Sequence, residues 1–121
     1  YKREIHRDSD SRTIVFLIYL NELNNSGSGG DLKLHHYKDL NVMVPSQPKE
    51  SECDTIKTIP PKIGRLVTFL NSYDSLHSVS EMKDYDGYRY FLYGSFTLLG
   101  KKNNFVKNSI SNLKTNFNIF E

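Results

Sequence analysis

The sequence predicts an all-β domain of two packed sheets with one helix at the C-terminal end, on three observations. Residues 65–70 and 88–96 alternate apolar and polar side chains and are rich in β-branched and aromatic types, which is typical of strands. Residues 12–21 form the strongest predicted strand, and apolar side chains on both of its faces require cover on both sides. Residues 101–121 instead carry apolar side chains at helical spacing.

The strand predicted over residues 12–21 lies at the centre of the domain. Val15, Leu17 and Tyr19 leave one face of this strand, and we expect that face to line the interior between the sheets. The opposite face carries Ile14, Phe16, Ile18 and Leu20. Because those side chains are also apolar, we expect a helix to cover them.

Shorter strands are predicted before and after it. Residues 1–8 are predicted as a short strand, and residues 31–37 as a half-exposed strand that follows a glycine-rich connection at residues 24–30. Residues 38–61 hold all four prolines and mixed charge, which predicts a long surface excursion with a short strand at residues 54–59.

The C-terminal residues predict a helix packed on the sheets. Apolar side chains recur there at spacings of four, three, four and three residues. They are Val106, Ile110, Leu113, Phe117 and Phe120. We therefore expect residues 1–100 to form the β core, and residues 101–121 to form a helical extension that covers the outer face of the strand at residues 12–21.

Composition narrows the class of partner. A net charge of +2, with no run of five like charges, is too small for a nucleic-acid surface and favours small polar partners. The single cysteine, Cys53, excludes an internal disulfide framework and favours a reducing compartment such as the cytoplasm. The longest apolar run, residues 14–20, is too short to span a bilayer. Because the chain starts at Tyr1, we expect an N-terminal portion to precede it.

Two histidines and one aspartate predict a metal centre. His6 and Asp8 are two residues apart, so their side chains leave the same face of a strand, and we expect His77 to lie in the connection between the last two strands. Two imidazoles and one carboxylate are the set that occupies one face of Fe(II) and leaves three positions open. Taken alone, a strand histidine beside an aspartate is more often an ordinary surface pair.

An arginine near this set suits an anionic ligand. Arg89 shares a predicted strand face with Phe91, Tyr93 and Ser95, and its planar guanidinium can bind a carboxylate through two hydrogen bonds. The Tyr19 hydroxyl is a second candidate donor to the same anion.

Three other candidate sites are weaker. His35 and His36 are adjacent on a predicted strand and point to opposite faces, which favours an exposed polar edge over a metal site. Cys53 lies in a predicted loop rich in proline and charge without a CxxC partner, so a catalytic thiol is disfavoured. The glycines of residues 27–30 lack the lysine of a phosphate-binding loop.

Six motifs follow one another in a particular order. They are His6-Arg7-Asp8, Arg12-Thr13 leading into Tyr19-Leu20-Asn21, Gly29-Gly30-Asp31-Leu32, PKIGRLVTF at residues 61–69, His77-Ser78-Val79 and Gly87-Tyr88-Arg89. This ordered set, from His6 to about Phe96, resembles the catalytic core of the iron- and 2-oxoglutarate-dependent dioxygenases, and within them the prolyl 4-hydroxylase branch.

The resemblance implies a double-stranded β-helix, or jelly-roll, without the helices that the family normally carries ahead of the first motif. It also implies that His6, Asp8 and His77 bind Fe(II), that Arg89 binds the far carboxylate of 2-oxoglutarate, and that Tyr19 contacts that carboxylate.

Other consequences of the resemblance concern the pocket and the reaction. Leu32 and Val79 match apolar positions that line the cosubstrate pocket, and Asp8 favours hydroxylation because halogenating relatives carry a small residue there. The implied reaction is hydroxylation of an unactivated C–H bond by dioxygen, with release of succinate and CO2. A prolyl residue of a protein or peptide is the expected substrate, and ascorbate is the expected stimulant. The alternative is a non-catalytic jelly-roll binding module of the same ancestry.

Overall fold

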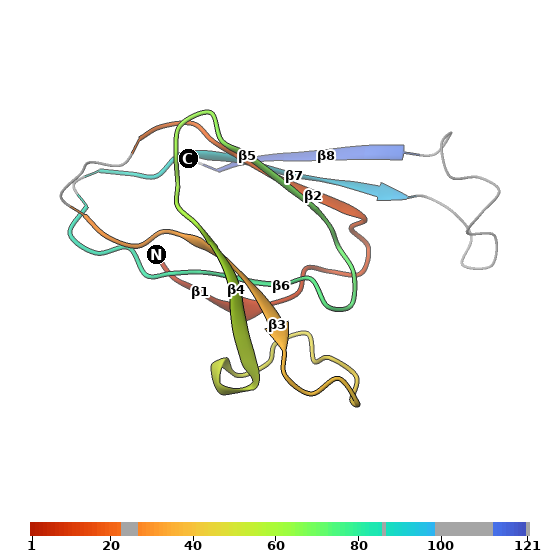
Figure 1. Ribbon diagram of the computed structural model, residues 1–121. Coiled ribbons are helices and arrows are strands. Elements are labelled where there is room, and N and C mark those ends of the chain that lie inside the picture. Colours follow the sequence, from red (N-terminus) through yellow and green to blue (C-terminus); the bar gives the residue numbers. More distant parts are fainter. Residues whose placement is uncertain (23–26, 86, 99–112, 121) are drawn as a thin grey trace.

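The computed structural model describes residues 1–22, 27–85, 87–98 and 113–120, which form eight strands in two antiparallel sheets (Figure 1). The strand order is β1-β6-β3-β4 in the first sheet and β5-β2-β7-β8 in the second. The prediction of an all-β jelly-roll made of two sheets is therefore confirmed.

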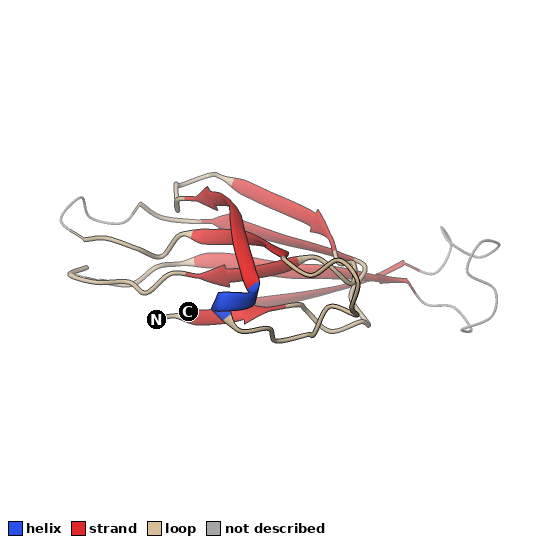
Figure 2. Cartoon of the chain, turned by 60° about the horizontal axis from the view of Figure 1, so that its bottom comes forward, coloured by secondary structure: helices blue, strands red, loops and turns tan. Residues whose placement is uncertain are grey.

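Most connections cross from one sheet to the other. The first sheet holds β1 (Arg3–His6), β6 (Leu76–Val79), β3 (Leu32–Tyr37) and β4 (Cys53–Ile59), and the 3-10 turn η1 (Glu50–Glu52) precedes β4. The second sheet holds β5 (Leu66–Leu70), β2 (Ile14–Tyr19), β7 (Phe91–Leu98) and β8 (Leu113–Phe120). Figure 2 shows the strands and η1 from a second direction. Because the chain crosses between the sheets after β1, β2, β4, β5 and β6, strands far apart in sequence become neighbours, as β1 and β6 do.

Strand β2 lies inside the second sheet, paired with β5 and β7. Val15 and Tyr19 are each only 1% exposed, so the face predicted to line the interior does so. On the opposite face the Phe16 ring lies against Gly94, where a β-carbon would overlap it, and 5.8 Å from the Phe96 ring. In the part of the chain that the structure describes, these rings and not a helix lie over that face of β2 and β7.

The helix predicted at the C-terminal end is wrong for residues 113–120, which form β8. This strand pairs with β7 along its whole length, from Leu113 opposite Leu98 to Phe120 opposite Phe91. Its sequence, LKTNFNIF, also alternates between apolar or β-branched and polar residues over most of its length, and asparagine is a poor helix former. Residues 113–120 are therefore compatible with both the helical and the strand periodicity, and pairing with the free edge of β7 makes them a strand. Residues 99–112 and 121 of the predicted helix lie outside the described residues.

Two other expectations need correction. His77 lies within β6 and not in a connection. Cys53 begins β4 and is buried with Ile5 and Leu76 in a small apolar cluster on the first sheet. Val44 lies in the long excursion between β3 and β4 and packs against this cluster. The excursion therefore forms part of this small core. Among the described residues no helix is long and apolar enough to cross a membrane.

Candidate metal centre

His6, Asp8 and His77 converge where β1 lies beside β6. His6 is the last residue of β1 and stands directly opposite His77, with their ring centroids 4.3 Å apart. Asp8 follows β1 by two residues, and one oxygen of its carboxylate lies 3.7 Å from His77 Nε2. All three side chains are buried, and one ligand atom from each lies within 4.8 Å of the others. The structure thus brings together the three residues that the sequence singled out as a metal-binding set.

Hydrogen bonds orient both imidazoles toward a common point. His6 Nδ1 lies 2.8 Å from the Glu4 carbonyl oxygen and His77 Nδ1 lies 3.0 Å from that of Ser75. Because a carbonyl can only accept, each Nδ1 carries the proton and each Nε2 carries the lone pair, which in His6 accepts a hydrogen bond from Arg3. Burial lowers the pKa of both histidines, which favours the neutral form that binds a metal ion. This arrangement of the second nitrogen is the usual one for metal-binding histidines.

The Asp8 carboxylate is fixed by two side chains that the sequence analysis did not assign. An Arg12 guanidinium nitrogen lies 2.9 Å from one Asp8 oxygen, and the Tyr93 hydroxyl donates to the other oxygen over 3.1 Å. Burial first, and then the negative charge of Asp8, raise the pKa of Tyr93 to about 12, so its hydroxyl remains a donor. Arg12 also contacts the Tyr93 hydroxyl. A buried carboxylate requires such partners, because an unpaired buried charge is costly.

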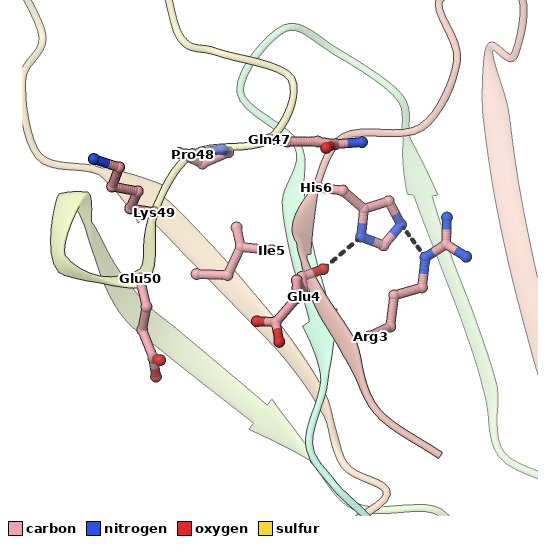
Figure 3. Close-up of a pocket in the computed structure, with 8 residues that line it drawn as sticks. All are labelled: Arg3, Glu4, Ile5, His6, Gln47, Pro48, Lys49 and Glu50. Carbon is pink, nitrogen blue, oxygen red and sulfur yellow. Dashed lines mark hydrogen bonds between the residues drawn. The ribbon is translucent and has the colours of Figure 1, made fainter.

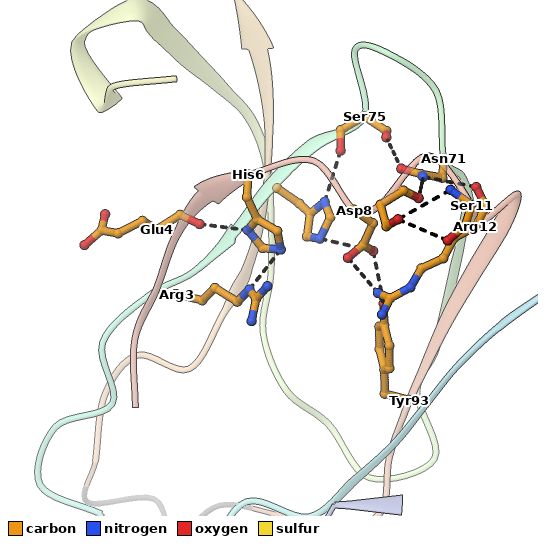
Figure 4. Close-up of polar contacts among 11 residues, drawn as sticks. Arg3, Glu4, His6, Asp8, Ser11, Arg12, Asn71, Ser75 and Tyr93 are labelled. Atoms are coloured by element: carbon orange, nitrogen blue, oxygen red, sulfur yellow. Dashed lines mark hydrogen bonds and ion pairs between the residues drawn. The ribbon is translucent and has the colours of Figure 1, made fainter. Parts of the chain in front are cut away.

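Two turns beside the candidate ligands are joined to each other by hydrogen bonds. The Asn71 amide donates to the backbone carbonyls of Ser9 and Arg12, at 2.9 and 3.1 Å, and accepts from the Ser75 hydroxyl at 3.1 Å (Figure 4). Ser75 is also the residue whose carbonyl orients His77. The turn after Asp8 and the turn before β6 therefore form one hydrogen-bonded unit around the three candidate ligands.

A second polar feature lies at Arg89, two residues before β7. One Arg89 nitrogen donates to the Gly30 carbonyl over 2.6 Å, which links the second sheet to the start of β3. The guanidinium carbon lies 5.1 to 5.8 Å from the ring centroids of Tyr1, Tyr19 and Phe91. Three rings therefore surround one half-buried cation.

The Tyr19 hydroxyl beside Arg89 is buried and, among the described residues, has no hydrogen-bond partner. Such an orphaned donor is costly unless a ligand satisfies it. On the first sheet, Leu32 and Val79 are paired across β3 and β6 and are 4% and 8% exposed. A cation, an orphaned hydroxyl and an apolar pair fit a ligand that ends in a carboxylate. Val79 follows His77 by two residues on β6, so both side chains leave the same face of the sheet.

The family model of the 2OG-Fe(II) oxygenase superfamily matches residues 1–96. The chain belongs to this superfamily. No curated protein and no solved structure matches the chain. The matched stretch includes all seven predicted site residues and ends within β7, before β8 begins. The donor set of this oxygenase, two imidazoles and one carboxylate, is of the type that binds Fe(II).

Beside the three candidate metal ligands, the oxygenase has a pocket along β1 with a volume of about 460 Å³ (Figure 3). It is lined by the four residues of β1, Arg3, Glu4, Ile5 and His6, and by Gln47, Pro48, Lys49 and Glu50 of the excursion between β3 and β4. Two acidic and two basic residues share this lining, so charge alone does not select its ligand. Within the same region, Arg3 Nε donates to His6 Nε2 over 2.9 Å.

Sequence reasoning missed Arg3, Arg12 and Tyr93 because each acts through a contact made by folding. The sequence does contain an indication for Tyr93, since it shares a predicted strand face with Arg89. The indication for Arg12 is weaker: it lies four residues after Asp8, across a predicted turn. The sequence contains no indication for Arg3, since Arg3 and His6 are three residues apart and would point to opposite faces of a regular strand.

The buried histidines predict that the metal-free protein loses stability in mild acid. The folded pKa of His6 and of His77 lies below the ordinary value of 6.5, so the unfolded chain takes up more protons as the pH falls. The contribution of the two neutral histidines to stability should therefore be complete above about pH 6.5. The free energy of unfolding should decrease as the pH falls from there toward the folded pKa values. Urea unfolding at several pH values measures this dependence.

The double substitution His6→Gln with His77→Gln should make the free energy of unfolding less dependent on pH. Buried His35 contributes a remaining slope, because its pKa is also lowered by burial. The exposed His36 offers a matched control, His36→Gln, that should keep the wild-type dependence. An unchanged slope in the double variant would contradict this account of the two candidate ligands.

Proposed function

We propose that this oxygenase hydroxylates an unactivated C–H bond with Fe(II), 2-oxoglutarate and dioxygen, and releases succinate and CO2. The observation that carries the proposal is the convergence of His6, Asp8 and His77, with the lone pair of each imidazole on Nε2 and all three side chains buried. Membership of the superfamily supports the same reaction class.

In this proposal His6, Asp8 and His77 hold Fe(II) on one face. When bound, the iron supplies dioxygen activation coupled to the oxidative decarboxylation of 2-oxoglutarate. Arg12 and Tyr93 keep the Asp8 carboxylate in place through their hydrogen bonds. The backbone carbonyls of Glu4 and Ser75 keep the two imidazoles in the tautomer that can bind the metal ion.

Arg89 and Tyr19 are proposed to bind the far carboxylate of 2-oxoglutarate. The guanidinium supplies charge and the orphaned hydroxyl supplies a further donor. The rings around Arg89 lower the local dielectric constant, which strengthens the pairing of opposite charges. Leu32 and Val79 are proposed to form the apolar wall that excludes water from the cosubstrate.

A prolyl residue of a protein or peptide is the proposed substrate. The order of the six sequence motifs supports the prolyl 4-hydroxylase branch, and the pocket along β1 offers space for an extended chain beside His6 (Figure 3). Asp8 supports hydroxylation over halogenation, since it keeps the carboxylate that halogenating relatives lack. The free and buried Cys53 is compatible with a reducing compartment, and we propose the cytoplasm.

Formation of succinate tests the proposed activity. The protein, with Fe(II), 2-oxoglutarate, ascorbate and oxygen, should form succinate slowly even without a primary substrate. Asp8→Gly should lower this rate sharply, because removal of the carboxylate leaves two protein ligands and opens a position to water. Wild-type protein that binds the metal ion but forms succinate only at the background rate would favour the alternative of a non-catalytic binding module.

Binding of 2-oxoglutarate should depend on Arg89. Arg89→Ala should weaken the affinity for 2-oxoglutarate by about 2 kcal/mol or more, since truncating one partner of a buried charge pair leaves the other unpaired. Arg89→Lys should restore part of the affinity, because it keeps the charge without the planar fork. Isothermal titration calorimetry of the Mn2+-loaded proteins measures both effects.

Arg65→Ala is the informative comparison. The Arg65 backbone carbonyl accepts from the Tyr19 amide over 3.1 Å, and the Arg65 side chain donates to the Pro60 carbonyl on an exposed surface. A large loss of 2-oxoglutarate affinity in this variant, with normal affinity in Arg89→Ala, would move the anchor of the cosubstrate from Arg89 to Arg65.

A further inference from the structure

Arg3 occupies an unexpected position beside the candidate metal ligands. In the pairing of β1 with β6, Arg3 stands opposite Val79 and His6 stands opposite His77, so three steps along β1 match two along β6. The extra residue is a β-bulge. A bulge shifts the alternation of side chains, and it allows Arg3 to reach the side of the strand on which His6 lies. Arg3 Nε then donates to His6 Nε2 over 2.9 Å (Figures 3 and 4).

This hydrogen bond uses the lone pair that a metal ion would need. His6 Nδ1 carries a proton that is donated to the Glu4 carbonyl, so Nε2 is the one acceptor of the ring. An imidazole nitrogen has a single lone pair and cannot serve a guanidinium and a metal ion at once. Arg3 is also a permanent cation, and a divalent cation bound at Nε2 would repel it at this short distance.

Arg3 is free to leave this contact. Its side chain is exposed, in contrast to the buried His6. Its place opposite Val79 puts it at the border between the three candidate metal ligands and the apolar pair proposed to line the cosubstrate pocket. A ligand that fills the open positions of a metal ion at His6 would carry its anionic group toward this border.

We propose that Arg3 competes with the metal ion for His6 Nε2 and, once displaced, pairs with the carboxylate of the ligand that completes the coordination of the metal. The proposal rests on the proposed function, because it requires the metal centre and a carboxylate ligand. Arg3 is then a positioning residue that makes binding of the metal ion and of the anion cooperative. Without the anion, Arg3 weakens metal binding; with it, Arg3 strengthens the complex.

Titration of Mn2+ into the metal-free protein, followed by electron paramagnetic resonance of free Mn2+, tests the competition. Arg3→Ala should bind Mn2+ at least about 10-fold more tightly than wild type, since metal binding no longer breaks a charge-assisted hydrogen bond. Lys2→Ala is the matched control: it removes the same charge from the neighbouring residue, whose side chain pairs with Glu4, and it should bind Mn2+ as wild type does. Circular dichroism checks that each variant is folded.

The same titrations at saturating 2-oxoglutarate test the second role. The advantage of Arg3→Ala should then disappear or reverse, because wild-type Arg3 gains the carboxylate as a partner. Equal or weaker Mn2+ binding by Arg3→Ala without 2-oxoglutarate would overturn the competition, and an undiminished advantage with 2-oxoglutarate would overturn the pairing with the anion. Absence of Mn2+ binding in all three proteins would overturn the metal centre itself, and with it this proposal.

Discussion

The pairing of β1 with β6 is the interaction on which the rest of the centre depends. It places His6 directly opposite His77, although the two residues lie far apart in sequence, and it buries both rings. Opposed residues on antiparallel strands have β-carbons about 5 Å apart, a suitable spacing for two imidazoles to reach one ion. The same strand, β6, carries Val79 two residues further on, so one backbone segment positions a candidate metal ligand and part of the candidate cosubstrate pocket.

Asp8 connects this pair to the opposite sheet. It follows β1 of the first sheet, while Tyr93 belongs to β7 of the second and Arg12 precedes β2. The buried carboxylate is therefore held by groups that meet only when both sheets pack. Arg89 makes a similar link in the other direction, from the second sheet to Gly30. A ligand that binds only the folded arrangement would in turn stabilise the packing of the sheets.

Much of the fold follows from local patterns in the sequence, since strand periodicity is a property of neighbouring residues. The alternation at residues 65–70 and the apolar run at residues 12–21 predicted β5 and β2 with small errors in their ends. The C-terminal strand could not be predicted in this way. Residues 113–120 are compatible with two periodicities, and the free edge of β7, which decides between them, is supplied by the tertiary structure.

The candidate site divides in the same manner. His6 and Asp8 are close in sequence, which predicted that they lie near each other although Asp8 lies beyond the end of β1, whereas the position of His77 within β6 depends on long-range pairing. His77 was first selected by its residue type and then supported by the resemblance to a known family, whereas Val79 came from the resemblance alone. The contact of Arg3 with His6 depends on a β-bulge, which no sequence pattern near residues 3–6 indicates.

The most direct measurement of the central claim is an anaerobic titration of Fe(II) and 2-oxoglutarate into the metal-free protein, followed by visible absorption spectroscopy. If His6, Asp8 and His77 hold Fe(II) and leave room for 2-oxoglutarate to chelate it, a weak charge-transfer band should appear and saturate at one equivalent of Fe(II). His77→Ala should greatly weaken the band at the same concentrations, because one of three protein ligands is missing. Absence of the band in the wild-type protein, or an unchanged band in His77→Ala, would contradict the assignment of this metal centre.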